Sequence, residues 1–588
     1  MSSIEKKNPF LPATAEEMAR LGWAWVDIVL VTGDAYVDHP SFGVALIARL
    51  LEAQGYRVAV LAQPRHHFPD DFTRFGKPRL FFGISAGNLD SIVSNYTGNA
   101  KVRDRDDYSP GGNPYFGEKA EKKHRRRPDR ATVRYANLAR AAFADVPVIL
   151  GGLEASLRRF IHYDYQQQRL RASVLTDAKA DLVVYGMGER AVLEIAERLS
   201  KGQDLHSIPG TCERFTQKQL AELDHNLFIT LPGWDEIAGD NRLFLDAELE
   251  IDRQARALSD KVLIQKQQAA WVVQNHPAPI LSAAEMDRLY SLPFTRACHP
   301  SCGDVPALKM IKDSFTIVRG CSGNCSFCAI TRHQGPVVVS RSKASIVAEV
   351  KAVASSKNFN GTVTDLGGPT ANLYGTSCKS PAPCRKHDCL YPKVCKFLDI
   401  DEQGFASLLR EVAAVAGVKN VFVSSGLRME LLLKTPRLLE QLLDHHTPGA
   451  LKIAPEHTQA KVLRLMHKPG LEVLQDFLAL CRRLTGKKNK KTLLTPYLIS
   501  AHPGCSSDDM EEMAERLQDL GLAVRQFQDF TPTPGTISTA MYVSGLDRET
   551  KTEIFVARNT VERRAQRLAL ERVKNKREKH KPVGKRKR

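Results

Sequence analysis

The sequence of 588 residues lacks the long apolar segments that a membrane protein needs. It contains no run of about 18 apolar residues, which argues against a membrane-spanning helix. The first residues, MSSIEKKNPF, contain no apolar signal region, so we expect no export. We therefore predict a cytoplasmic protein without a membrane partner.

The amino-acid composition excludes few other classes of protein. A hydrophobic content of 43% with 26% charged residues is ordinary for a soluble globular protein. The length predicts two to four domains. Twelve cysteines without a secretory signal favour a reducing compartment and metal ligation over disulfides.

Three cysteines with the spacing CxxxCxxC stand in one short run, RGCSGNCSFCAI: Cys321, Cys325 and Cys328. Three thiolates can hold three irons of a cubic 4Fe–4S cluster and leave the fourth iron without a protein ligand, whereas an electron-transfer ferredoxin would supply a fourth cysteine. The open iron can bind the amino and carboxylate groups of S-adenosylmethionine. A zinc clip or buried free thiols are the alternatives. Zinc normally takes four ligands, and only His333 follows closely.

The N-terminal part alternates strand and helix patterns. Such alternation predicts an open parallel sheet in an α/β domain, which we place at residues 1–215. The expected strands lie at residues 26–32, 56–61, 80–84, 146–150 and 182–185. Glycine turns follow two of them, at 151–156 and 186–189. Neither turn reads GxGxxG, so we expect tight turns without a dinucleotide. Residues 216–300 read as a helical connecting segment.

Residues 301–545 show six strand–helix units. The strands are expected near 314–318, 361–366, 418–424, 450–454, 492–499 and 522–529. Six parallel units predict a partial (β/α)6 barrel, and function on barrels sits at the C-terminal ends of strands. The three-cysteine loop follows the first of these strands.

Small and polar residues recur at the ends of the later strands. Two glycines after the second strand would let a backbone approach a ligand closely. Hydroxyl groups after the third strand suit a ribose, and a carboxylate follows the fourth. These candidate cofactor-binding residues are Gly367, Gly368, Ser424, Ser425 and Glu456. No residue stands out as catalytic.

These motifs resemble those of radical S-adenosylmethionine (radical SAM) enzymes, and more closely the YgiQ family. The resemblance lies in residues 318–335, 367–372, 151–159 and 185–189, and it extends over nearly the whole chain. It implies a 4Fe–4S cluster on the three cysteines and an electron donor such as flavodoxin or ferredoxin. It also implies reductive cleavage of S-adenosylmethionine to a 5′-deoxyadenosyl radical, which would modify an unknown substrate.

The resemblance also suggests roles for single residues. Gly367 and Gly368 correspond to the methionine-binding motif, although Pro369 replaces its usual acidic residue. Glu456 corresponds to an acidic ligand-binding position. The N-terminal domain resembles cobalamin-binding domains, but their DxHxxG motif is absent, because Asp38 and His39 are adjacent here. We therefore do not expect cobalamin.

A second group of cysteines lies in an insertion, residues 378–395. The four residues are Cys378, Cys384, Cys389 and Cys395, and they stand among prolines and basic residues. Four thiolates can complete a structural zinc site or an auxiliary iron–sulfur cluster. The spacing matches no common pattern, so reduced thiols are the alternative.

The net charge of +18 raises the question whether the protein binds nucleic acid. Residues 546–588 read as a helical to disordered basic tail, in which residues 572–588 hold ten Lys or Arg and one Glu. A second basic stretch, 119–130, reads as an exposed loop. RNA modification is therefore one alternative function, although no RNA-recognition-motif signature is evident. A non-catalytic iron–sulfur or zinc protein that senses redox state is another.

Overall fold

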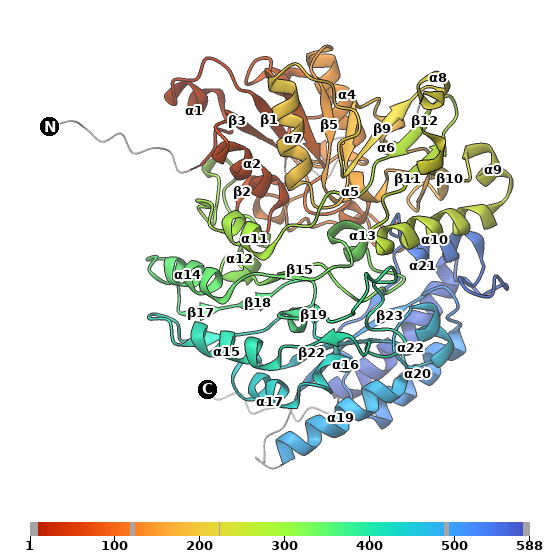
Figure 1. Ribbon diagram of the computed structural model, residues 1–588. Helices are drawn as coiled ribbons and strands as arrows, with labels where there is room; N and C mark the ends of the chain where they lie inside the picture. The colour runs from red at the N-terminus through yellow and green to blue at the C-terminus, as the bar shows by residue number, and fades with distance from the viewer. Residues whose placement is uncertain (1–9, 118–123, 223, 487–492, 580–588) are drawn as a thin grey trace. The chain divides into compact units, whose positions relative to one another are not determined.

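A computed structural model describes residues 10–117, 124–222, 224–486 and 493–579 (Figure 1). The chain divides into two compact units. Unit 1 extends to Lys312 and includes the short segments Arg332–Gly335 and Thr533–Gly535, and unit 2 comprises the rest. None of the helices in these ranges combines the length and apolar content of a membrane span.

Unit 1 is built on a nine-stranded sheet in the order β10-β11-β12-β9-β8-β5-β4-β1-β3. Five neighbouring strands form its parallel block: β1 (Ile28–Thr32), β3 (Val58–Ala62), β4 (Phe81–Ser85), β5 (Val148–Leu150) and β8 (Leu182–Val184). They lie where the sequence predicts them. The α/β class and the open parallel sheet are therefore confirmed.

Helices cover both faces of this sheet (Figure 1). Because successive side chains of a strand point to opposite faces, β1 contributes to two cores. Ile28 and Leu30 belong to one core with residues of α2 (Gly43–Ala53) and α7 (Glu189–Ser200). Val29 and Val31 belong to the other core, with residues of α4 (Ala131–Ala142).

The prediction of a helical connecting segment at residues 216–300 is wrong. These residues contain strands β10 (Phe228–Leu231), β11 (Val262–Lys266) and β12 (Trp271–Gln274), which extend the sheet beyond β9 (Thr211–Phe215). β12 pairs antiparallel with both β11 and β9. The long charged helix α10 (Asn241–Ala257) dominates the composition here, so the short strands were missed.

The second basic stretch is not an exposed loop in the part that is described. Residues 118–123 lie outside the described ranges, but Arg125 and Arg127 are buried. Arg127 is paired with Asp34 at 2.6 Å and with Asp106 at 3.1 Å. A guanidinium buried between two carboxylates serves the fold and is not available to a phosphate backbone.

Unit 2 contains strands at the six predicted positions. They are β14 (Ser314–Thr316), β17 and β18 (Thr362–Val363 and Asp365–Gly367), β21 (Asn420–Val421), β22 (Leu451–Glu456), β23 (Leu494–Ser500) and β24 (Gln528–Asp529). β14–β18, β17–β21, β22–β23 and β23–β24 pair in parallel, and a parallel bridge joins Leu427 to Ile453. Each strand thus neighbours the next one along the chain.

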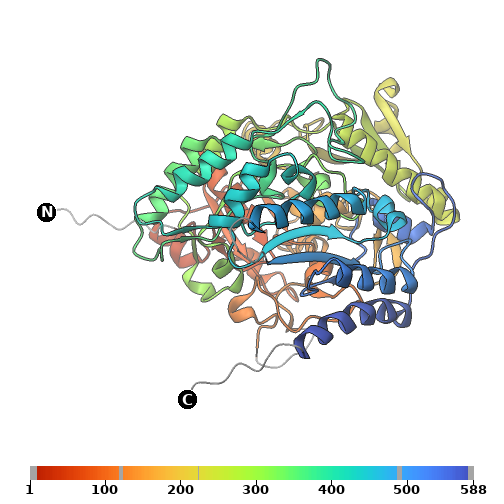
Figure 2. The same cartoon turned by 90° about the horizontal axis from the view of Figure 1, so that it is seen from below.

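Helices of unit 2 run beside these strands (Figure 2). α14 (Lys343–Ala354), α15 (Glu402–Ala413), α17 (Pro436–His445), α19 (Leu471–Gly486) and α20 (Ser507–Asp519) follow successive strands. The last helix, α22 (Thr560–Lys579), packs against α20 and buries Leu570 and Val573. The tail predicted as disordered from residue 572 is therefore helical as far as Lys579, and residues 580–588 lie outside the described ranges.

Candidate functional site

The three-cysteine loop follows β15 (Val318–Arg319) in unit 2 and is anchored through Ser326. The backbone N–H of Ser326 donates to the carbonyl of Met466 at 2.9 Å, and its carbonyl accepts from the N–H of Ser538 at 2.9 Å. Arg548 Nη1 donates to Ser326 Oγ at 2.8 Å. Three distant segments thus hold the residue between the second and third cysteines.

A buried cation contacts the loop. Arg428 Nη2 donates to Cys325 Sγ at 3.1 Å, and its Nη1 donates to Glu430 at 2.7 Å. Although burial opposes its charge, the Cys325 thiolate and Glu430 raise the pKa of Arg428 well above its ordinary value. A Cβ on Gly323 would lie only 1.9 Å from Nη2, so a larger residue here would displace the guanidinium from Cys325.

The donor set fits three irons of a 4Fe–4S cluster. Three thiols lie on one short loop, and a permanently charged guanidinium beside Cys325 offsets part of the negative charge of a thiolate-bound cluster. Burial, with Cys325 adding to the effect, raises the pKa of the Cys328 thiol to about 12. A metal bound at this thiol would stabilise the thiolate that burial disfavours.

A cavity of about 690 Å³ opens beside the loop. Phe327, the residue before the third cysteine, forms part of its wall. Strands β22, β23 and β24 contribute most of the rest, and two arginines complete the lining. Besides Phe327, the lining residues are Glu456, Tyr497, Leu498, Ile499, Arg525, Gln526, Phe527, Gln528 and Arg567. The cavity thus joins the cysteine loop to the ends of the last three strands.

Glu456 is the carboxylate of this cavity. It is 8% exposed, and its backbone has φ 66°, a left-handed conformation that is costly for a residue other than glycine. Burial raises the pKa of Glu456, although Lys468 and Arg428 oppose this shift. Its carboxylate has no hydrogen-bond partner among the described residues. A strained, buried and unpartnered carboxylate is expected where a ligand supplies the missing donor.

Three of the predicted residues, Gly367, Ser424 and Ser425, gather around Asp365. Ser424 and Ser425 donate their N–H groups to Asp365 Oδ1 at 2.7 and 3.1 Å, and the Ser425 hydroxyl donates to Oδ2. A Cβ on Gly367 would lie 2.2 Å from the same carboxylate. Ser424 Oγ donates to the carbonyl of Thr364 at 2.7 Å. Both hydroxyls therefore already donate within the protein and have only lone pairs to offer a ribose.

Two residues of this site, Asp365 and Arg428, are not among the candidates that the sequence predicts. The sequence carries a weak signal for both, because each is a charged residue at the end of an apolar strand run. Gly368 lies close to the strand before the loop, where its Cβ would be 2.5 Å from the carbonyl oxygen of Val318.

The second cysteine group lies in an irregular segment of unit 2. Cys378 is exposed, and Cys384, Cys389 and Cys395 are half-buried. The backbone N–H of Cys389 donates to the carbonyl of Ser322 at 3.1 Å, so the segment contacts the three-cysteine loop. Within the described ranges, no three His, Cys, Asp or Glu side chains are already arranged as ligands around one point.

The glycine turn after β5 has a structural role in unit 1. A Cβ on Gly152 would lie 2.6 Å from Ser85 Oγ. Glu154 is buried and accepts from the N–H of Ser91 at 2.7 Å and from the N–H of Thr132 at 3.0 Å. These contacts tie three segments together and agree with the expectation of a tight turn.

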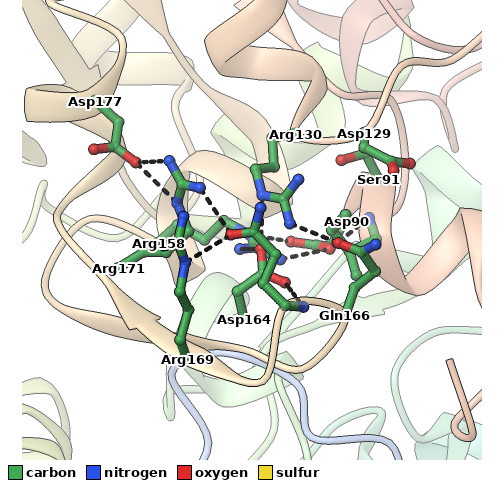
Figure 3. A network of polar contacts seen from close by, with 12 residues as sticks. Asp90, Ser91, Asp129, Arg130, Arg158, Asp164, Gln166, Arg169, Arg171 and Asp177 are labelled. Carbon is green, nitrogen blue, oxygen red and sulfur yellow. Dashed lines mark hydrogen bonds and ion pairs between the residues drawn. The ribbon is translucent and has the colours of Figure 1, made fainter.

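Arg158 of the same motif centres a buried network of charges (Figure 3). It donates to Asp90 at 2.6 and 3.1 Å and lies 3.5 Å from Asp164. Arg130 also donates to Asp164, at 2.8 Å, and to Gln166 at 2.8 Å. Because the carboxylates are matched by guanidinium groups, this network reads as an internal support of the sheet.

The residues at the cobalamin-like motif do not fit ligation of cobalt by histidine. His39 is fully buried, its Nδ1 accepts from the N–H of Ser41 at 3.1 Å, and its Nε2 lies 3.0 Å from Arg296 Nη1. Asp38 is buried and paired with Arg49 at 2.5 Å. Both motif residues are therefore committed to the fold.

Comparison with protein families accounts for residues 10–517 of the chain. Residues 10–314 match the model described as "Radical SAM N-terminal", and residues 315–517 match "Radical SAM superfamily". The boundary falls two residues from the division between the two compact units at 312/313.

Named relatives extend over the same length. A "UPF0313 protein" of Thermotoga neapolitana is 48% identical over 563 residues, which cover 94% of this chain and 96% of the relative. A "UPF0313 protein" of Methanocella arvoryzae is 43% identical over 565 residues, 95% of this chain and 92% of the relative. This chain belongs to the UPF0313 (YgiQ) family of radical SAM proteins. The predicted resemblance is confirmed.

Solved structures show a more distant likeness. The radical S-adenosylmethionine methyltransferase TsrM from Kitasatospora setae, with cobalamin and a [4Fe–4S] cluster bound, has a TM-score of 0.49 and 15% identity, over 86% of this chain and 76% of that chain. The cobalamin-dependent enzyme OxsB, with aqua-cobalamin bound, has a TM-score of 0.45 and 10% identity, over 90% of this chain and 56% of that chain. The ligands named are those of TsrM and OxsB.

Proposed function

We propose that this protein is an enzyme that cleaves S-adenosylmethionine reductively and modifies a substrate with the resulting radical. The supporting observation is the anchored three-cysteine loop beside a cavity that holds an unpartnered carboxylate. When bound, a 4Fe–4S cluster supplies the electron that splits the sulfonium into methionine and a 5′-deoxyadenosyl radical. The six parallel strands of unit 2 then serve as the partial barrel around this chemistry.

The residues of the chain have separate tasks in this proposal. Cys321, Cys325 and Cys328 hold three irons. Arg428 places its positive charge next to the sulfur atom of Cys325. Glu456 accepts hydrogen bonds from an ammonium or ribose hydroxyl group of S-adenosylmethionine, and Phe327 excludes water from the space between loop and cavity. Exclusion of water protects a reactive intermediate from side reactions.

The backbone around Asp365 offers a second set of contacts. Gly367 and Gly368 stand at the end of β18, where Asp365, Ser425 and Val318 fill the space that side chains would take. These two glycines can therefore offer a ligand only their backbone groups. We assign the methionine part of S-adenosylmethionine to this point and its ribose to Ser424 and Ser425, as acceptors. An electron donor such as flavodoxin or ferredoxin supplies the electron, and the cytoplasm is the expected location.

Detection of 5′-deoxyadenosine tests the proposal. The protein is reconstituted anaerobically with iron and sulfide, reduced with dithionite, and incubated with S-adenosylmethionine and cell extract as a source of substrates. We expect 5′-deoxyadenosine from the parent and none from a variant in which all three loop cysteines are alanine. A parent that carries four irons per loop and yet forms no 5′-deoxyadenosine with any reductant would contradict the proposal.

The cluster spectrum separates this function from a redox sensor. An open iron that binds S-adenosylmethionine changes the EPR spectrum of the reduced cluster when this molecule is added. A redox-sensing protein would form the cluster without such a change. Modification of RNA remains an alternative substrate class, and its support is reduced because Arg125 and Arg127 are buried.

A further inference from the structure

The insertion after β18 closes on itself through its backbone. Its ends form two short strands, β19 (Ser377–Cys378) and β20 (Leu398–Asp399), which pair antiparallel and place Cys378 opposite Leu398. Lys379 N–H donates to the carbonyl of Phe397 at 2.8 Å and extends this closure. The eighteen residues from Cys378 to Cys395 therefore form a loop whose two ends meet.

A chain of hydrogen bonds brings the cysteines of this loop toward one another. Leu398 N–H donates to the carbonyl of Cys395 at 3.1 Å, and Cys395 N–H donates to the carbonyl of Cys389 at 2.8 Å. Since Cys378 is opposite Leu398, three of the four cysteines are joined by consecutive backbone contacts. The fourth, Cys384, accepts from the N–H of His387 at 3.5 Å.

Contacts beside Cys389 hold the middle of this loop. His467 Nε2 lies 2.6 Å from Asp388 Oδ2, and the ring centroids of Tyr391 and His467 are 3.7 Å apart. Leu390 is the one fully buried apolar side chain of residues 378–395. The loop is therefore fixed on both sides of Cys389.

We propose that Cys378, Cys384, Cys389 and Cys395 bind a second metal centre, separate from the three-cysteine loop. Four thiolates complete either a tetrahedral zinc site or an auxiliary iron–sulfur cluster. The backbone contacts between Cys378, Cys389 and Cys395 keep three of the four ligands in one short stretch of the fold. Four basic residues of the same stretch, Arg385, Lys386, Lys393 and Lys396, would offset part of the negative charge, whereas Lys379 is paired with Asp399 at 2.7 Å.

This second centre stabilises the surroundings of the first loop. Cys389 would be one of its ligands, and the N–H of Cys389 donates to the carbonyl of Ser322, which lies between the first two loop cysteines. Metal binding at the insertion therefore fixes a residue that is hydrogen-bonded to the radical-cluster loop. The inference does not depend on cleavage of S-adenosylmethionine.

Metal analysis of a variant without the first site tests the inference. A variant with Cys321, Cys325 and Cys328 all changed to Ala is purified under anaerobic conditions from cells supplied with iron and zinc. We expect it to retain about one zinc per chain, or the iron, sulfide and visible absorption of one cluster. The two results distinguish the zinc site from the iron–sulfur site, and both support a second centre.

Further substitutions locate the ligands. Adding Cys389→Ser and Cys395→Ser to the triple variant should reduce bound metal at least tenfold. Adding Cys298→Ser, a half-buried cysteine of unit 1, should leave the metal content unchanged. Circular dichroism confirms that each variant is folded. In the parent protein, a chelator strong enough to remove zinc should also expose residues 379–397 to protease.

The inference is overturned by either of two results. One is a folded triple variant that holds no stoichiometric zinc or iron even after reconstitution. The other is metal that remains bound after Cys389 and Cys395 are replaced. A parent protein that never forms 5′-deoxyadenosine would contradict the proposed enzymatic function and would leave the metal content of the triple variant unaffected.

Discussion

Arg428 forms a direct hydrogen bond to a cysteine of the three-cysteine loop. Its guanidinium donates to Cys325 and to Glu430, its side chain is only 9% exposed, and Gly323 leaves the space that it occupies. Hydrogen bonds to cluster sulfurs and nearby charge are among the determinants of an iron–sulfur potential. A fixed positive charge favours the reduced, more negative state.

We therefore expect Arg428→Met to lower the midpoint potential of the cluster. Loss of a tenfold preference for the reduced state corresponds to about 59 mV for a one-electron couple, and a fall of this order is expected. Arg428→Lys keeps the charge and should shift the potential less. The measurement is a redox titration followed by EPR, with the exposed Arg410→Met as control. An unchanged potential in Arg428→Met would show that this arginine does not tune the cluster.

Glu456 gives a prediction about pH. Its pKa is raised in the folded protein, so ionisation of the buried carboxylate opposes folding at pH values above its ordinary value of 4.5. Without ligand, Glu456→Gln should have the higher free energy of unfolding at pH 8. The difference should disappear as the pH falls below 4.5, where both folded and unfolded carboxyls are protonated. Denaturant titrations at several pH values measure it.

The same substitution should lower the affinity for S-adenosylmethionine. A hydrogen bond to a charged group contributes about 1.5–3 kcal/mol, so Glu456→Gln should bind S-adenosylmethionine about 10- to 100-fold less tightly. Isothermal calorimetry on the reconstituted protein measures this affinity. Gain of stability together with loss of affinity is the expected signature of a binding residue. Loss of both would instead identify Glu456 as part of the structural framework.

At the residue scale, the sequence allows prediction of the cysteines that would bind the cluster, but not of the residues that hydrogen-bond to the site. CxxxCxxC is a local pattern, so all three cysteines could be identified from spacing. The contact of Arg428 with Cys325 joins positions 103 residues apart, and no local pattern encodes it. The same holds for Asp365, whose partners Ser424 and Ser425 lie about sixty residues further on.

At the scale of the element, the cysteine loop contains two serines in contrasting surroundings. Ser326 Oγ accepts from Arg548, whereas the buried hydroxyl of Ser322 has no hydrogen-bond partner among the described residues. Loss of a partner to a buried charged group is costly, whereas removal of an unsatisfied hydroxyl is nearly neutral or stabilising.

Ser326→Ala should therefore accelerate loss of iron to a chelator by about tenfold, on the scale of the 1.5–3 kcal/mol of a charge-assisted hydrogen bond. Ser322→Ala is the matched control from the same loop, and its rate should equal that of the parent. The release of iron is followed by the decrease in visible absorption. Equal effects of the two substitutions would mean that the hydrogen bond from Arg548 does not hold the loop.

Strands were predictable where their apolar run was uninterrupted. Ile28–Thr32 is buried along its whole length and was identified from composition alone. The strands at Val262–Lys266 and Trp271–Gln274 are as short, but they follow a charged helix of seventeen residues. They join the sheet through pairing with each other and with β9. Local composition does not show such pairing, and the sheet was underestimated for this reason.

At the scale of the whole molecule, the excess positive charge is concentrated at the C-terminus. Residues 580–588 contain five Lys or Arg, and α22 ends before them at Lys579. Deletion of 580–588 should leave the fold intact and weaken binding to single-stranded RNA. The slope of log K against log salt should become less steep by up to about 3.5, at roughly 0.7 for each phosphate that the tail no longer neutralises. Filter binding over a series of salt concentrations measures it, and an unchanged slope would exclude the tail from RNA binding.

The anchors of Ser326 have a consequence for biogenesis. Its partners belong to Met466, Ser538 and Arg548, and the last of these is 222 residues downstream. At about 5–20 residues per second, a ribosome needs roughly 10–45 s to make that stretch. Cys389 and Arg428 can contact the loop earlier in synthesis, but the three contacts of Ser326 form only after most of the chain has been made. A product truncated before Arg548 would carry the three thiols without this support.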